Sequence, residues 1–276
     1  MRPVALQLPG LSIEGWSRAG DATWFRVHPP GLAIDVGRGA MQLAGAADVF
    51  VSHGHLDHAL GLPFVLSQRS LHRGATTRVF CPREIAEPLA DLVGAAARLE
   101  NARYVWELVP LAPGERVEVG RDHLLETFRT DHVVPTLGLH LIRKKRRLAA
   151  HLAGVPGAEL AAMRERGEDP CEVVEELAFS YAADTGPGVF DLEPRLFETA
   201  VLLLECTFLR QSHRGRGDRY KHLHIEDLAE RAGRFRNQAI VLHHLSRRHG
   251  VEELREAVAR HLPELAPRVH LLVEGG

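Results

Sequence analysis

Short apolar runs alternate along the chain with segments of helical periodicity. The apolar runs predict strands at 23–27, 32–36, 49–52, 78–81, 105–109, 123–128, 137–142, 178–182, 200–204 and 239–243. Apolar residues spaced three or four positions apart predict helices at 83–99, 158–166, 225–236 and 251–261. This order of strands and helices predicts an α/β fold in which helices cover the outer faces of sheets.

The stretch 154–170 interrupts the pattern. It contains two prolines and three glycines, which predict a surface insertion better than a linker between domains. No internal repeat and no disordered tract divides the chain, and 276 residues are enough for one sizeable core. We therefore expect a single domain that spans residues 1–276.

The charge balance limits the classes of partner. The 34 Lys and Arg residues face 36 Asp and Glu residues, so the net charge of −2 gives no overall attraction to nucleic acid or to an anionic membrane. A polyanion would have to be held locally. The basic runs 143–147 and 210–221 could do so, and the alternative interpretation of both is a solvated surface.

The chain carries no sign of a membrane segment or of a disulfide framework. No apolar run approaches the roughly 20 residues of a membrane span, and the N-terminus lacks a leader pattern, so we expect a cytoplasmic protein. Cys81, Cys171 and Cys206 are widely spaced and odd in number, which argues against disulfides and a cysteine-based zinc finger. Metal binding would depend on carboxylates and on the 17 histidines.

Four potential metal ligands follow the strand predicted at 49–52. They are His53, His55, Asp57 and His58. The first two lie two positions apart in an extended segment, so both imidazoles point to one side and can hold one metal ion. Asp57 and His58 lie where the loop turns into a helix and can face a second ion. The alternative is a set of capping and surface histidines.

Three further candidates lie at the ends of later apolar runs. They are His132, Asp184 and His244. Each residue taken alone is more often a plain loop residue than a ligand. Their common position at the ends of predicted strands favours a shared site with the four ligands of the first motif.

With these residues in place, the sequence resembles the metallo-β-lactamase superfamily and, within it, the ribonuclease Z family, endonucleases that trim the 3′ ends of tRNA precursors. The matching segments are Ile34-Asp35-Val36-Gly37, 49–58, Gly61-Leu62-Pro63 with 66–70, His132-Val133-Val134-Pro135 with Gly138, Tyr181 with Asp184-Thr185, Leu204-Glu205-Cys206-Thr207-Phe208, Tyr220-Lys221-His222 and 242–248. The resemblance implies a four-layer αβ/βα sandwich, the metallo-β-lactamase fold.

The resemblance also implies two zinc ions, with manganese or iron as alternative metals. One ion would be held by His53, His55, His132 and Asp184, and the other by Asp57, His58, Asp184 and His244, so that Asp184 bridges them. His243 competes with His244 for the last position, and the spacing of the family motif favours His244.

A catalytic apparatus is implied at three places. Glu205 and His222 correspond to the family's catalytic pair, with His224 as a rival for the histidine, and Asp57 would orient or deprotonate the attacking water while a metal-bound hydroxide is the nucleophile. Arg248 would contact a phosphate. Lys144 and Lys145 would contact RNA, and the family implies a homodimer.

The sequence departs from the family where RNA should be gripped. The family's long arm should lie between the strand at Gly138 and Asp184, and this interval holds only the run 143–147, the stretch 154–170 and a short acidic piece. Three functions therefore compete: an RNA phosphodiesterase, a hydrolase of small phosphodiesters such as cyclic nucleotides or of other esters, and a metal-binding module without chemistry. The complete ligand set argues against the third.

Overall fold

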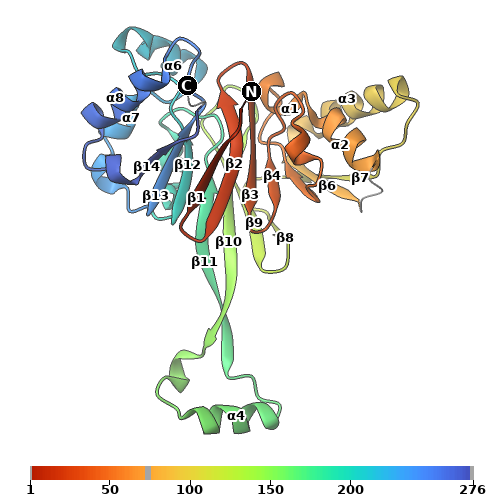
Figure 1. Ribbon diagram of the computed structural model, residues 1–276, viewed down its shortest axis with the longest axis vertical. Helices are drawn as coiled ribbons and strands as arrows, with labels where there is room; N and C mark the ends of the chain where they lie inside the picture. The colour runs from red at the N-terminus through yellow and green to blue at the C-terminus, as the bar shows by residue number, and fades with distance from the viewer. Residues whose placement is uncertain (1, 72–75, 274–276) are drawn as a thin grey trace.

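The computed structural model describes residues 2–71 and 76–273, and within these ranges the strands form two seven-stranded sheets (Figure 1). The first sheet contains, side by side, β1 (Val4–Leu8), β2 (Leu11–Arg18), β3 (Ala22–His28), β4 (Leu32–Ile34), β5 (Asp48–Phe50), β6 (Thr77–Pro82) and β7 (Trp106–Leu111). The second contains β8 (Arg116–Val119), β9 (His123–Arg129), β10 (Leu137–Leu148), β11 (Cys171–Tyr181), β12 (Val201–Glu205), β13 (Ala239–His243) and β14 (Val269–Leu271). Neighbouring strands are parallel from β4 to β7 and from β11 to β14, and antiparallel elsewhere.

All described helices but one lie beside the two sheets. On the side of the first sheet are α1 (Leu56–Ala59), α2 (Leu62–Leu71) and α3 (Ala86–Leu99). On the side of the second sheet are α5 (Val189–Leu192), α6 (Arg214–Tyr220), α7 (Ile225–Ala229) and α8 (Val251–His261). Short 3₁₀ turns lie at Met41–Leu43, Arg83–Ile85, Ala150–Leu152, Pro194–Phe197, Gln211–His213, Ala232–Arg234 and Ala266–Arg268. The exception, α4 (Gly157–Glu165), lies far from both sheets.

The buried apolar side chains of the described residues form three clusters, one for each contact between layers. One cluster fills the space between the two sheets, the second joins the second sheet to its helices, and the third joins the first sheet to α2 and α3. Three such contacts require four layers. The four-layer αβ/βα sandwich expected from the sequence is thereby confirmed.

The central strands of the second sheet are buried on both faces, which explains their continuous apolar sequence. In β12, Val201 and Leu203 point into the cluster between the sheets, whereas Leu202 and Leu204 point toward the helices. The same alternation runs through β13. Because side chains alternate along a strand, His243 continues the series that points between the sheets.

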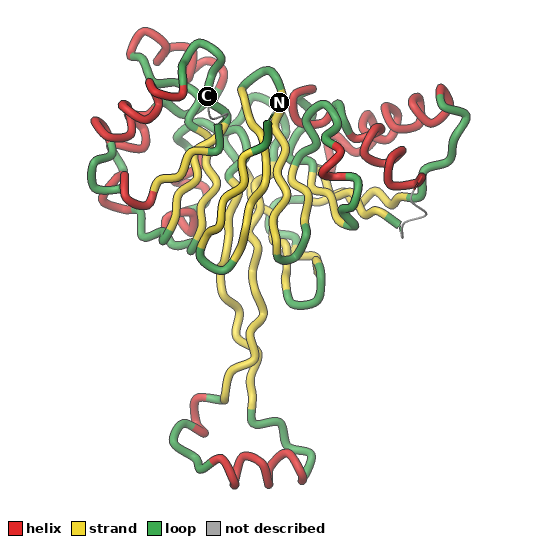
Figure 2. The backbone as a smooth tube through the Cα atoms, viewed as in Figure 1, coloured by secondary structure: helices red, strands yellow, loops and turns green. Residues whose placement is uncertain are grey.

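A two-stranded arm extends from the body (Figure 2). β10 and β11 stay paired as far as Leu148 and Cys171, and α4 lies at the tip between them. The expectation that the interval before Asp184 forms no arm is wrong. The reason is that the arm's parts of β10 and β11 read RKKRR and CEVVEE. Strands that are exposed on both sides need no apolar alternation, so these charged segments do not show the pattern from which strands are predicted.

The arm is electrically balanced. Residues 143–176 contain seven basic and seven acidic side chains. At the arm's base, Nζ of Lys144 lies 2.6 Å from a carboxylate oxygen of Glu118, and Nζ of Lys145 lies 2.5 Å from one of Glu176. Much of the basic run is therefore neutralised by its own neighbours.

The elements expected from the sequence are confirmed, with shifted ends. The predicted helix at 225–236 is interrupted after α7, and β1, β2, β8, β14, α1, α2, α5 and α6 had not been predicted. Most of these are short or begin near the chain's ends. Within the described part of the chain, no helix is long and apolar enough to cross a membrane.

The arm should be dispensable for stability. No described residue from 143 to 176 belongs to any of the three apolar clusters. We expect a variant in which Asn-Gly replaces 145–174, joining the cross-strand pair Lys144 and Glu175, to unfold within about 3 °C of the intact protein, about 1 kcal/mol for a chain of this size. Thermal unfolding followed by circular dichroism measures this. A drop of more than about 10 °C would show that the arm supports the body.

Candidate metal centre

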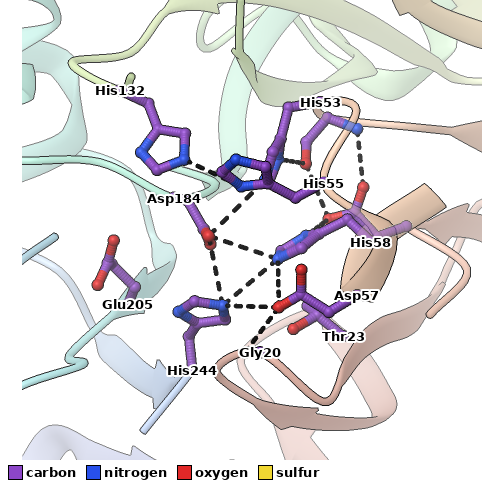
Figure 3. A network of polar contacts seen from close by, with 12 residues as sticks. Gly20, Thr23, His53, His55, Asp57, His58, His132, Asp184, Glu205 and His244 are labelled. Carbon is purple, nitrogen blue, oxygen red and sulfur yellow. Dashed lines mark hydrogen bonds and ion pairs between the residues drawn. The ribbon is translucent and has the colours of Figure 1, made fainter. Parts of the chain in front are cut away.

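The predicted ligands converge where strands of both sheets end (Figure 3). His53, His55, Asp57 and His58 follow β5, and His132, Asp184 and His244 follow β9, β11 and β13. β9 and β11 are both antiparallel to β10, so they run in the same direction and end at the same edge. The topology therefore gathers ligands that are far apart in the sequence.

One group of donors contains His53, His55, His132 and Asp184. Nε2 of His53 lies 3.1 Å from Nδ1 of His55, and Nε2 of His132 lies 3.4 Å from the same Nδ1 atom. The Asp184 carboxylate lies 3.7 Å from Nε2 of His53. These three nitrogens and one carboxylate surround a common point.

The second group contains Asp57, His58 and His244, and it also meets Asp184. Oδ2 of Asp184 lies 3.5 Å from Nε2 of His58 and 3.3 Å from Nε2 of His244. Oδ2 of Asp57 lies 3.7 Å from Nε2 of His244. Asp184 is the residue that both groups share.

The donor set fits divalent metal ions. Oδ1 of Asp184 is buried and has no hydrogen-bond partner, which is costly for a carboxylate unless a cation meets it. Burial raises the pKa of Asp184, but the charges of His244 and His58 outweigh burial and lower the pKa well below its usual value. Burial lowers the pKa of His53, which favours the neutral imidazole that metals bind. Imidazole and carboxylate ligands of this kind suit zinc, manganese and iron.

Each of four imidazoles has its second nitrogen held from outside the centre. Nδ1 of His53 lies 2.9 Å from the hydroxyl of Ser52, Nδ1 of His58 lies 2.8 Å from the carboxylate of Asp35, Nδ1 of His244 lies 3.0 Å from the hydroxyl of Thr207, and Nδ1 of His132 lies 3.1 Å from the carbonyl of Lys221. In each case Nε2 is left to face the centre. Such outer partners fix the orientation and tautomer of a ligand.

Asp35 holds two of these histidines, His58 directly and His53 through the hydroxyl of Ser52. Its carboxylate accepts hydrogen bonds from the backbone and the hydroxyl of Ser52 at 2.7 and 2.9 Å, and from the hydroxyl of Tyr181 at 2.7 Å. With the bond from His58 it has four donors and is fully buried. Asp35 belongs to one of the segments that match the family, but no role was predicted for it. An acidic residue at the end of an apolar run was the available signal.

Glu205 and His222 form a hydrogen-bonded pair beside the centre. Nδ1 of His222 lies 2.8 Å from Oε1 of Glu205, whose two oxygens also accept from the backbone of Thr185 and Leu223. The His222 ring stacks on that of His244, 5.3 Å between centroids. Burial lowers the pKa of His222, but the Glu205 carboxylate outweighs burial and raises it to about 9. His222 also lies near enough to Asp184 and His244 to complete a third donor group.

The carboxylate of Asp57 lies in a different environment from that of Asp184. Its Oδ2 accepts a 2.8 Å hydrogen bond from the backbone of Gly20. Burial raises the pKa of Asp57, but the hydrogen bond with His244 and the charges of His58 and His244 outweigh burial, so the pKa lies well below its usual value. Asp57 is therefore ionised at neutral pH, and its carboxylate can orient a water molecule.

Both rival histidines lie outside the donor groups. His243 is buried between the sheets, where its ring packs against Phe25 and Tyr181. His224 caps the N-terminus of α7: its Nδ1 accepts from the backbone of Glu226, while Asp227 accepts from the backbone of His224. Thus His224 begins a helix, and His243 completes the core between the sheets.

A cavity of about 410 Å³ opens beside the centre, and we call it the mouth cavity. It is lined by Ala19, Gly20, His55, Val133, Thr207, Phe208, Tyr220, His222, Ser246, Arg247 and Arg248. Arg248 therefore lines the cavity beside the centre, and its role as a phosphate contact stays a prediction. Lys144 and Lys145 do not, because they lie on the arm, which leaves the opposite end of β11 from Asp184.

Asp35 offers a test of how the centre is held. Asp35→Asn keeps the size of the side chain but gives the donors of Ser52, His58 and Tyr181 fewer acceptors. We expect zinc affinity to fall roughly 10- to 100-fold in a competition titration with a chelator, because the ligand histidines lose their fixed orientation. Tyr181→Phe removes one donor only and should weaken zinc less. Unchanged affinity in Asp35→Asn would mean that Asp35 serves the fold alone.

The sequence matches a known family along most of its length. Residues 37–245 match the model of the beta-lactamase superfamily domain. The chain is 30% identical to tRNase Z TRZ1 of Arabidopsis thaliana over 274 residues, which cover 98% of each chain. A ribonuclease Z of Thermobifida fusca is 33% identical over 270 residues, 86% of this chain and 81% of that protein.

Solved structures share the fold at low sequence identity. The human tRNase Z short form matches with a TM-score of 0.64 and 17% identity over 95% of this chain and 96% of that one. The metallo-beta-lactamase fold protein YhfI of Bacillus subtilis matches with a TM-score of 0.66 and 13% identity over 100% and 98%. The chain thus belongs to the beta-lactamase superfamily and, within it, to the ribonuclease Z-like metal-dependent hydrolases.

Proposed function

We propose that this chain is a zinc-dependent phosphodiesterase that cleaves RNA, with the 3′ ends of tRNA precursors as its substrate. One observation carries the proposal: two donor groups both contact Asp184 and lie beside the Glu205–His222 pair at an open cavity. The relatives named tRNase Z and ribonuclease Z support the choice of RNA. A cytoplasmic location stays a prediction from the sequence.

Two zinc ions fit the ligand sets implied by the sequence. His53, His55, His132 and Asp184 would hold one ion, and Asp57, His58, Asp184 and His244 the other. Bound together, such ions supply a water whose pKa is near 7 and neutralise charge on the phosphoryl oxygens. Manganese or iron could take the same nitrogen and oxygen ligands.

The chain's own residues would move the protons. The ionised Asp57 carboxylate, fixed by the backbone of Gly20, can accept the proton of the attacking water. His222 holds a proton at neutral pH and can donate it to the leaving 3′ oxygen, while Glu205 fixes its ring through Nδ1. Arg248 at the rim can neutralise the phosphate.

The arm bears on the choice between RNA and a small phosphodiester as the substrate. It provides a surface far from the metal centre that a small substrate would not need. On the arm, Lys144 and Lys145 are the proposed RNA contacts. However, the arm's equal numbers of acidic and basic side chains favour the second candidate function, hydrolysis of small phosphodiesters in the mouth cavity.

A homodimer is supported by the exposed apolar side chains of one short segment. Leu56 in α1, Leu60 between the helices, and Phe64 and Leu71 in α2 are between 41% and 72% exposed. Exposed apolar side chains gathered within 16 residues favour a protein interface in this part of the chain.

The role of His222 can be separated from metal binding. We expect His222→Ala to keep its zinc and to lose turnover of bis-p-nitrophenyl phosphate by roughly 10²- to 10⁴-fold, the usual contribution of a general acid. In the wild type, turnover should fall on the alkaline side as His222 loses its proton, at or below about pH 9, because bound dications lower its pKa. Glu205→Gln should keep zinc and lose less. Loss of zinc from His222→Ala would reassign His222 to the metal ligands.

The contribution of the arm to RNA binding can be measured by salt dependence. Changing Lys144 and Lys145 to Ala should weaken binding of a tRNA precursor and make the log–log salt slope shallower by about 0.7 for each phosphate that these lysines neutralise. Hydrolysis of bis-p-nitrophenyl phosphate measures the centre separately. As a matched control, Arg255 and Arg260 on the exposed side of α8 are changed to Ala. Equal RNA affinity of both variants at every salt concentration would favour the small-substrate function.

A further inference from the structure

The mouth cavity combines an aromatic surface with positive charge. Tyr220, the last residue of α6, is 41% exposed and lines the cavity together with Phe208 and the 51% exposed Val133. The cavity therefore presents an accessible aromatic ring next to apolar and cationic side chains. Nucleobases stack on such rings, and stacking is the usual way in which proteins hold single-stranded RNA.

Positive charge surrounds this ring. The guanidinium groups of Arg216 and Arg219 lie over the Tyr220 ring, 5.7 and 5.4 Å from its centre, so a base that stacks on the ring would displace one of them from it. Arg247 and Arg248 line the mouth cavity itself. Within the described part of the chain these four arginines form no ion pair, in contrast to Lys144 and Lys145 on the arm. Unpaired arginines around a stacking surface fit the phosphates on either side of a nucleotide.

The position of His222 gives the polarity of the nucleotide. Cleavage breaks the bond between phosphorus and the 3′ oxygen, water supplies the new oxygen on phosphorus, and the proton from His222 leaves a 3′ hydroxyl on the departing strand. His222 lines the mouth cavity, two residues after Tyr220. The mouth cavity is therefore placed to hold the nucleotide that carries the leaving 3′ oxygen.

We propose that the mouth cavity binds the nucleotide on the 5′ side of the scissile phosphate, with its base stacked on Tyr220 and its phosphates neutralised by the four arginines. The proposal rests on the proposed phosphodiesterase function and adds the residues that recognise the substrate next to the cleaved bond. Recognition by stacking tolerates any base, because every base presents a flat π surface. The cavity then binds the end of one RNA strand and does not select its base.

The test compares two short RNAs on the zinc-loaded protein. One is a fluorescein-labelled pentamer with a 3′ hydroxyl, which matches the departing strand, and the other is the same pentamer with an abasic 3′-terminal nucleotide. Fluorescence anisotropy should show that the wild type binds the abasic strand roughly 5- to 100-fold more weakly. In Tyr220→Ala this difference should shrink to less than about twofold, and Tyr220→Phe should restore it because the ring is kept.

Leu99→Ala is the matched control, because Leu99 is an 89% exposed apolar side chain at the end of α3, outside the cavity. It should leave the difference between the two RNAs unchanged. Equal affinity of the wild type for both strands, no binding of either, or the full difference persisting in Tyr220→Ala would overturn the proposal. Hydrolysis of bis-p-nitrophenyl phosphate by the same wild-type preparation distinguishes these outcomes from failure of the proposed function, which predicts turnover of that ester.

Discussion

The carboxylate of Asp184 is the point on which the centre depends. It is buried, one of its oxygens has no protein partner among the described residues, and the other faces the imidazoles of His53, His58 and His244 within 3.7 Å. A buried carboxylate with an unpaired oxygen is stable only when cations approach it. The imidazole nitrogens of the same residues converge on one space, where metal ions would satisfy them together with the carboxylate. The arrangement therefore belongs to a protein that carries metal ions.

Around Asp184, the residues that hydrogen-bond to the predicted metal ligands connect the two sheets. Asp35 at the end of β4 in the first sheet binds His58 and also accepts from Tyr181 on β11 in the second. Thr207 after β12 lies 3.0 Å from Nδ1 of His244 and 2.5 Å from Oε2 of Glu205. Because the partners of the ligands come from different strands, metal binding and the packing of the sandwich support each other. The hydroxyl of Thr207 also joins the metal ligands to the Glu205–His222 pair.

Much of the centre was predictable because its chemistry is local in the sequence. The spacing of His53, His55, Asp57 and His58 is fixed by one strand end and one helix start, and the apolar runs before Asp184 and His244 mark the edge to which these residues belong. The alternation of side chains along β13 could also have decided between His243 and His244, because it directs His243 between the sheets. The strand geometry ends at His244, whose backbone is left-handed with φ of 58°, and the ring of His244 lies in the centre.

The arm and the outer partners could not be predicted in the same way. The arm's strands face solvent on both sides, so their charged sequence carries neither an apolar period nor a turn signal at the body. The carbonyl of Lys221 that holds His132 is a backbone group, which no residue pattern reveals. Likewise, the ion pairs of Lys144 and Lys145 depend on the register of neighbouring strands and on the Glu118 and Glu176 side chains.

X-ray absorption at the zinc edge tests the shared carboxylate most directly. The wild type should show a metal–metal distance of about 3.5–4 Å that Asp184→Ala lacks. Isolated zinc ions in the wild type would contradict the account.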